Sequence, residues 1–405
     1  MNNIPDGWKK YRLEEIAEIY NGNSINKTVK AEKYTGLKEG YNFIGTKDVG
    51  FDGIVNYENG VKIPFGESKF KIAPGDCVFV CSEGGSAGKK TAYITQKVCF
   101  GNKLFAIVPK TKDCSSKYIY YFTRSNNFFD QFKSLLAGII GGVSNKNFGK
   151  INLPLPSISE QQRIVAKIEE LFSKLDAGIE SLKKAKQQLA VYRQAVLKEA
   201  FEQKENWRCV KLSDIGAINL GRQRSPKNIS KDYPTKYIRA ANITEAGIDV
   251  SDILEMEFTP KEREKYYLKK NDIILSEASG SASQVGKPAI WKNEIENCCF
   301  QNTVIRHRIA KDNPEYVFWY YKYLYMSGYF SRKVGGVGIN HLGANNFSDF
   351  EINIPVSMEE QSSIVSQIES RLSVCDQIER TVNESLEKAD VLRQSILKKA
   401  FEGGL

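Results

Sequence analysis

One long motif occurs twice in this chain, and its two copies begin about 200 residues apart. Residues 157–176 read SISEQQRIVAKIEELFSKLD, and residues 357–376 read SMEEQSSIVSQIESRLSVCD. The likeness resumes in VYRQAVLKEAFE at 191–202 and VLRQSILKKAFE at 391–402. A period of about 200 residues is far longer than the roughly 20 to 50 residues of a solenoid repeat. The pattern therefore predicts a duplicated module large enough to contain a complete domain.

Both copies of the motif have the hydrophobic spacing of a long helix. Apolar residues recur mostly at alternating steps of three and four positions, which is typical of a coiled-coil seam. In the first copy these residues are Val165, Ile168, Phe172, Leu175, Ile179, Leu182 and Leu189. One such helix alone cannot bury its apolar stripe, so we expect the two helices to pair with each other. The alternative is two separate coiled coils, each with its own partner.

The regions that precede the two helices also resemble each other. The pattern W-x-x-x-x-L-x-x-I occurs at 8–16 and again at 207–215, and Gly-Gly-Val followed by Asn-Phe occurs at 141–148 and 335–347. Short β-like runs alternate with aromatic helical stretches in each region, which predicts two compact α+β domains. The aromatic stretches could stack on nucleic-acid bases, but we expect them to pack in the domain cores.

The predicted fold class is therefore α+β with a pseudo-twofold internal repeat. Two globular mixed α/β domains are separated by two long coiled-coil helices, which run antiparallel if the second returns beside the first. We expect the domains and helices to span, in order, residues 1–155, 156–203, 204–355 and 356–405.

The charge balance favours a polyanionic partner. The net charge is +10 and the pI is about 9.0, which is typical of proteins that bind nucleic acid, although a solvated lysine surface would give the same balance. The eight cysteines form no framework, so we expect reduced thiols and no metal site. No apolar run reaches the roughly 18 residues of a membrane span, and residues 1–12 lack a signal-peptide core. We therefore expect a cytoplasmic protein without membrane contact.

Motifs for catalysis or cofactor binding are missing from the sequence. Residues 84–90 resemble a phosphate-binding loop, but Lys90 stands where that motif needs Ser or Thr. The chain has two histidines, so we expect neither a histidine-based triad nor a multi-histidine metal site. We expect neither enzymatic activity in the chain alone nor a bound cofactor.

Three repeated motifs resemble those of a known family. Each helix starts after a strand and a proline with E-Q-x-x-I-V, each helix ends with A-F-E, and each globular region opens with W-x-x-x-x-L-x-x-I. With these motifs present twice and in order, the chain resembles, over its whole length, the specificity (S) subunit of type I restriction-modification systems. One departure is that Ser362 follows the second E-Q pair, where Gln162 follows the first.

The resemblance implies a non-catalytic subunit that reads a bipartite DNA target, with one target recognition domain for each half-site. It implies double-stranded DNA as a partner, and two methyltransferase (M) subunits that dock on the paired helices; restriction (R) subunits are a further candidate. The partner-binding candidates on the helices are Glu160, Gln161, Arg163, Arg193, Glu360, Gln361 and Arg393.

Glycine-rich basic loops are the candidates for DNA contact. Glycine permits a close approach of the backbone, Lys and Arg suit phosphates and guanine, and Asn and Gln suit adenine. The candidates are Lys89, Lys90, Ser144, Asn145, Lys146, Arg222, Arg224, Lys227, Gln284, Lys287, Asn340 and His341. For each of them, the alternative is an ordinary exposed loop residue.

Two other functions stay open at this point. The first is an autonomous DNA methyltransferase or nuclease with a built-in DNA reader, which would need a cofactor or metal motif. The second is a coiled-coil adaptor without a DNA role, against which the basic balance and the paired glycine-rich loops argue.

Overall fold

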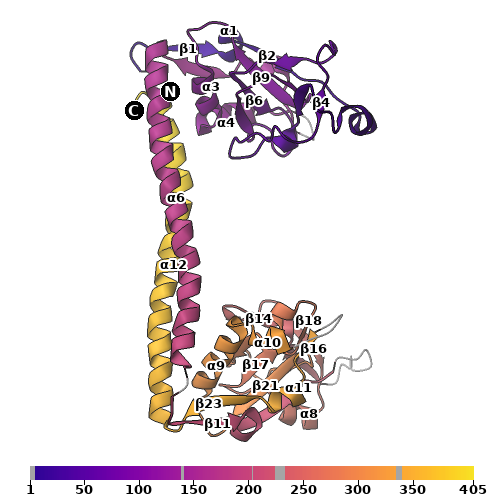
Figure 1. Ribbon diagram of the computed structural model, residues 1–405, viewed down its shortest axis with the longest axis vertical. Coiled ribbons are helices and arrows are strands. Elements are labelled where there is room, and N and C mark those ends of the chain that lie inside the picture. Colours follow the sequence, from indigo (N-terminus) through magenta and orange to yellow (C-terminus); the bar gives the residue numbers. More distant parts are fainter. Residues whose placement is uncertain (1–4, 138–140, 203, 224–232, 334–339) are drawn as a thin grey trace. The chain divides into compact units, whose positions relative to one another are not determined.

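The chain is arranged as two compact units that are each built on the same plan. The computed structural model describes residues 5–137, 141–202, 204–223, 233–333 and 340–405. Unit 1 comprises Met1–Leu182 and Asn383–Leu405, and unit 2 comprises Lys183–Val382. Each unit contains one globular domain and parts of two long helices, α6 (Ile158–Ala200) and α12 (Met358–Phe401), which Figure 1 labels.

The globular domain of unit 1 is built on two four-stranded sheets. The strands of the first sheet, in spatial order, are β2 (Ala17–Asn21), β9 (Leu104–Pro109), β6 (Cys77–Cys81) and β7 (Thr91–Ile94). Those of the second sheet are β4 (Lys62–Ile63), β3 (Tyr41–Ile44), β8 (Val98–Phe100) and β5 (Ile72–Ala73). The helices of the domain include α1 (Leu13–Ile16), α2 (Lys27–Val29), α3 (Ser116–Thr123), α4 (Asn126–Ser134) and α5 (Asn145–Phe148). Every residue of β6 is buried, as expected of the apolar run CVFVC.

The globular domain of unit 2 repeats this arrangement. Its first sheet has the order β12 (Gly216–Leu220), β21 (Val304–Ile309), β17 (Ile273–Ser276) and β19 (Pro288–Ile290). The second sheet has the order β16 (Leu254–Glu257), β13 (Pro234–Ile238) and β20 (Cys299–Phe300). The other elements include α7 (Leu212–Ile215), β14 (Ile243–Thr244), β15 (Gly247–Ile248), α8 (Pro260–Tyr266), β18 (Ala278–Ser279), α9 (Pro314–Met326), α10 (Tyr329–Lys333), β22 (Asn340–His341) and α11 (Ala344–Ser348). A parallel strand pair occurs at the same place in both units, with Phe43 opposite Cys99 and Tyr237 opposite Cys299.

The first and last strands of each domain pair with each other. β1 (Lys9–Arg12) is antiparallel to β10 (Asn152–Leu155), and β11 (Trp207–Lys211) is antiparallel to β23 (Glu351–Pro355). The W-x-x-x-x-L-x-x-I motif therefore lies beside the strand that leads into the long helix. This pairing closes each domain at the point where its helix begins.

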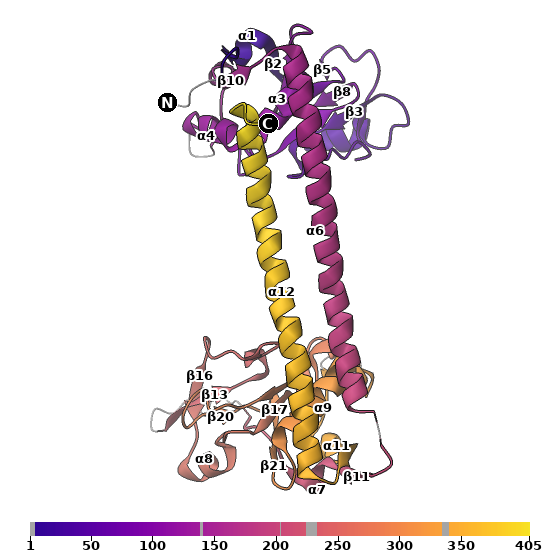
Figure 2. The ribbon, with the colours of Figure 1, turned by 90° about the vertical axis from the view of Figure 1, so that its left-hand side faces the viewer.

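The two long helices pack antiparallel within each unit, which confirms the predicted fold class. Figure 2 shows the last turns of α12 beside the first turns of α6 in unit 1. There Arg393 forms an ion pair with Asp176, and in unit 2 Arg193 pairs with Asp376 at 2.7 Å. Each pair is the repeat-equivalent of the other, so the two units use the same kind of ion pair between their helices.

The A-F-E motif at each helix end anchors that end to an aromatic helix. The centre of the Phe401 ring lies 5.1 Å from the centre of the Tyr118 ring of α3, and the centre of the Phe201 ring lies 5.4 Å from the centre of the Tyr316 ring of α9. The aromatic stretches are buried in the domain cores, so the prediction of core packing is confirmed. Within the described ranges, none of the helices combines the length and apolar character that a membrane span needs.

A buried histidine makes the stability of unit 2 sensitive to acid. His307 of β21 is fully buried with its Nδ1 2.6 Å from the Tyr321 hydroxyl, and this burial lowers its pKa to about 4. The unfolded chain takes up the proton near the ordinary value of about 6.5, so the stabilisation is complete above that pH and is lost as pH falls toward 4. We expect a loss of about 2 to 3 kcal/mol between pH 7 and pH 4.5 from this residue.

Denaturation of the purified chain followed by tryptophan fluorescence measures this effect, since Trp207, Trp291 and Trp319 all belong to unit 2. The His307→Gln variant should be less stable at pH 7 but should lose less stability on acidification. An equal loss in variant and parent would contradict the assignment.

Candidate nucleic-acid interface

Two glycine-rich loops of unit 1 that are far apart in sequence lie side by side. The Gly84 N–H donates to the Gly141 carbonyl at 3.0 Å, and the Val143 N–H donates to the Ser82 carbonyl at 3.1 Å. Glu83 and Gly142 form a bridge between the two loops. The candidates Lys89 and Lys146 therefore belong to two loops that are joined by backbone hydrogen bonds.

The five candidates in these loops differ in how free their side chains are. Lys89, Asn145 and Lys146 are exposed. The Lys90 ammonium donates to the Thr46 carbonyl at 3.0 Å and lies 5.1 Å from the centre of the Phe51 ring. The exposed Ser144 caps α5, because its hydroxyl accepts a hydrogen bond from the Asn147 N–H at 3.3 Å. Lys89, Asn145 and Lys146 are therefore the side chains with the most freedom to meet a ligand.

Unit 2 joins its corresponding loops in the same way. The Leu342 N–H donates to the Glu277 carbonyl at 2.9 Å, and β18 pairs with β22 so that Ala278 lies opposite His341. The candidates Gln284 and Lys287 line a cavity of about 400 Å³, together with Ala278. Asn340 is part of β22, but its side chain lies outside the described part of the structure.

One glycine in each loop fits only because it has no side chain. Gly88 has φ +68°, and a Cβ there would lie 2.5 Å from the Phe132 ring. Gly286 has φ +76°, and a Cβ there would lie 2.4 Å from the Phe330 ring. Both backbones are in the left-handed region that favours glycine. The same close contact therefore places the loop against an aromatic side chain in both domains.

The remaining candidates for DNA contact in unit 2 are either held by contacts within the chain or lie outside the described residues. Arg222 is 13 % exposed, its Nε donates to Glu262 at 2.8 Å, and its guanidinium lies 5.3 Å from the Phe258 ring. It also donates to the Glu257 carbonyl. These contacts favour a structural role for Arg222. Arg224 and Lys227 lie outside the described residues.

Gln161 and Gln361, which were predicted to bind a partner, make contacts within the chain instead. They are fully buried. Gln161 accepts from the Ser115 N–H at 2.9 Å and donates to the Asp113 and Pro156 carbonyls, each at 2.9 Å. Gln361 accepts from the Asn313 N–H at 2.8 Å and donates to Asp312 and to the Pro355 carbonyl. Their amides fasten each helix to its own domain, which leaves no polar atom for another protein.

The other helix candidates are partly committed to contacts within the chain. Glu160 and Arg163 form a bidentate pair at 2.7 and 2.8 Å, which keeps the pKa of Glu160 below its usual value. Glu360 accepts from the Trp207 indole N–H at 3.1 Å. Arg193 and Arg393 join the two helices, as described above. None of these contacts tests docking, so it stays a prediction for these five residues.

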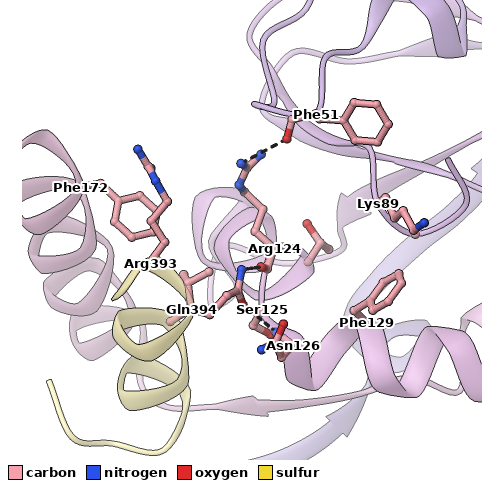
Figure 3. Close-up of a pocket in the computed structure, with 12 residues that line it drawn as sticks. Phe51, Lys89, Arg124, Ser125, Asn126, Phe129, Phe172, Arg393 and Gln394 are labelled. Carbon is pink, nitrogen blue, oxygen red and sulfur yellow. Dashed lines mark hydrogen bonds between the residues drawn. The ribbon is translucent and has the colours of Figure 1, made fainter. Parts of the chain in front are cut away.

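A cationic pocket of unit 1 escaped prediction from the sequence (Figure 3). Lys89, Arg124, Arg393 and Gln394 are among its lining residues. The Gln394 amide donates to the Arg124 carbonyl and accepts from the Asn126 N–H, each at 3.1 Å. The sequence repeats an Arg-Gln pair in VYRQ and VLRQ, which could have drawn attention to this helix end. The repeat does not indicate which loop the helix end packs against.

Groups of three or more His, Cys, Asp or Glu side chains that could hold a metal ion are absent from the described residues. Buried cysteines are also poor ligands or nucleophiles, because burial raises the pKa of Cys77, Cys114, Cys298 and Cys299 to about 12.

Comparisons with known proteins agree with the repeat. Residues 5–190 and 204–388 both match the family described as type I restriction modification DNA specificity domain. The chain is 27 % identical to the type I restriction enzyme EcoKI specificity subunit of Escherichia coli K12, over 99 % of this chain and 90 % of that one. It is 26 % identical to the StySPI specificity subunit of Salmonella potsdam, with the same coverage.

Solved structures show the same fold. A chain from a study of type I R-M complex assembly and conformational transition aligns over 100 % of both chains with a TM-score of 0.76 and 17 % identity. The HsdS subunit from Thermoanaerobacter tengcongensis aligns over 100 % of this chain and 98 % of its own, with a TM-score of 0.64 and 17 % identity.

The chain belongs to the type I restriction modification DNA specificity family. It is a non-catalytic DNA-recognition subunit that reads a bipartite target, which confirms the resemblance drawn from the repeated motifs. The family assignment removes the two alternatives, an autonomous enzyme and an adaptor without a DNA role.

Proposed function

We propose that each globular domain reads one half-site of the DNA target through its pair of joined glycine-rich loops. The observation that carries this proposal is that both domains join these loops by the same backbone contacts but present different side chains. Domain 1 offers Lys89, Asn145 and Lys146, and domain 2 offers Gln284, Lys287 and His341. The same loop backbone with different side chains suits a protein that reads two DNA half-sites of different sequence.

We propose that the paired helices dock two methyltransferase subunits and set the spacing between the half-sites. In support, Val191 is 67 % exposed and its repeat-equivalent Val391 is 70 % exposed. Exposed apolar side chains at equivalent places suit two equivalent docking surfaces. A restriction subunit joins the same complex, which acts in the cytoplasm. The domain boundaries at 155, 203 and 355 are part of this proposal.

Lys89 should contribute to DNA affinity through a phosphate contact. In the assembled methyltransferase complex, Lys89→Gln should weaken binding uniformly across sequences and lower the slope of log K against log salt by about 1. The recognised sequence should not change. Binding titrations over a range of salt concentrations measure this slope.

Lys97→Gln is the matched control. Lys97 is exposed in the turn that follows β7, whereas Lys89 lies in the loop that precedes β7, so the two lysines are at opposite ends of this strand. An equal change of slope for both variants, or none for Lys89→Gln, would contradict the proposed interface.

A further inference from the structure

A nearly buried carboxylate holds an exposed histidine at the loop junction of unit 2. The His341 Nδ1 lies 3.1 and 3.3 Å from the two carboxylate oxygens of Glu277. The Glu277 side chain is 9 % exposed, whereas the His341 side chain is 57 % exposed. The pair therefore places a fixed acceptor beneath a ring that faces outward.

The backbone around this pair repeats in unit 1 without the pair. The Glu277 N–H donates to the Thr303 carbonyl at 2.9 Å, and the Ser82 N–H donates to the Lys103 carbonyl at 2.9 Å. The Glu277 carbonyl accepts from Leu342, as the Ser82 carbonyl accepts from Val143. Ser82 is therefore the equivalent of Glu277.

By the same register, Gly142 is the equivalent of His341, because Gly142 is bridged to Glu83 as His341 is bridged to Ala278. Unit 1 thus forms the same loop junction with a serine and a glycine. The carboxylate and the imidazole are not needed for this fold, and a nearly buried carboxylate costs desolvation energy. The fold of the junction therefore does not explain why the pair is present.

The chemistry of the pair directs one ring nitrogen to the outside. A carboxylate only accepts hydrogen bonds, so the Nδ1–H of His341 donates to Glu277, which sets the ring orientation. The other nitrogen, Nε2, has no hydrogen-bond partner among the described residues. Ala278, which lies opposite His341 in the strand register, lines the cavity that also contains Gln284 and Lys287.

We propose that His341 determines specificity by presenting Nε2 to a base edge in the half-site of domain 2, and that Glu277 is the positioning residue that holds the ring. This inference rests on the proposed function. It adds Glu277, a residue that does not touch DNA itself, to the groups that decide which base is accepted.

The test replaces each residue by its equivalent from domain 1, since that domain forms the same junction with them. His341→Gly and Glu277→Ser are made in the full chain, and the methyltransferase complex is assembled with each. Competition binding then uses DNA duplexes with single base-pair changes in both half-sites. Melting of the free chain serves as the measure of folding.

We expect His341→Gly to lose roughly tenfold discrimination at one base pair of a single half-site. Glu277→Ser should lose discrimination at that same base pair, and the double variant should be no worse than His341→Gly. Glu277→Gln keeps an acceptor and should retain most of the discrimination. The other half-site is the internal control, and melting should shift by no more than about 2 °C.

Unchanged discrimination in Glu277→Ser, or a uniform loss over all base pairs, would overturn the inference. If the parent complex recognises a split sequence and the variants do not differ from it, this inference alone fails. If the parent complex itself shows no split sequence, the proposed function fails first.

Discussion

Replacing Gln161 by alanine is expected to destabilise unit 1 by about 3 kcal/mol or more. The change removes three hydrogen bonds and leaves the Ser115 N–H and the Asp113 and Pro156 carbonyls without their partner. An unpaired buried group costs about 1 to 3 kcal/mol. The bond to the Pro156 carbonyl is buried and the other two are part-buried, so the summed loss still exceeds that of an ordinary surface substitution. Gln361→Ala should destabilise unit 2 in a similar way, because Gln361 also makes three hydrogen bonds, one of them to the Asp312 carboxylate where Gln161 uses the Asp113 carbonyl.

Thermal and denaturant unfolding of the purified chain measure this loss. Gln162→Ala is the matched control, because Gln162 is the next residue of the helix and is exposed. The control should remain within about 0.5 kcal/mol of the parent. If Gln161→Ala left stability unchanged but abolished methyltransferase binding, the structural role that we assign to Gln161 would be wrong.

Exchanging the whole second recognition domain should change one half-site completely and leave the other as it was. The exchange takes residues 207–355 from another member of the family. Both β11 and β23 are included because they pair along their whole length, from Trp207 with Pro355 to Lys211 with Glu351. The helices are unchanged, so the number of unread base pairs between the half-sites should stay the same.

Sequencing of methylated sites in cells that carry the exchanged chain reads out this result. Exchange of the first domain, residues 8–155, is the reciprocal control and should change only the other half-site. A change in both half-sites, or in the spacing alone, would mean that the two domains do not read DNA independently.

The paired helices could be predicted from the sequence because their signal is local and repeated. Apolar residues recur at steps of three and four positions through α6 and α12. The same pattern in both copies of the motif strengthens the prediction of a helix for each. The strand order within the domains was not predictable in this way. It depends on pairings such as Phe43 with Cys99, which join residues far apart in the chain and are not revealed by the pattern of either strand.

The candidate site was harder to predict, because it depends on which polar groups the fold has already used. Gln161 occupies a position that looks like an exposed first turn, yet the loop around Ser115 covers it. Arg222 lies in a basic loop that suits DNA, yet Glu262 from α8 binds it. Glu277 has no signal in the sequence, because its contact with His341 forms only when β22 pairs with β18.

Methylome sequencing of cells that express this chain with its methyltransferase subunit, and of matched cells without the chain, tests the central claim most directly. The account predicts a split motif, with two half-sites separated by a fixed number of unread base pairs, that disappears when the chain is deleted. A methylation pattern that is the same with and without the chain, or a continuous motif without a gap, would contradict it.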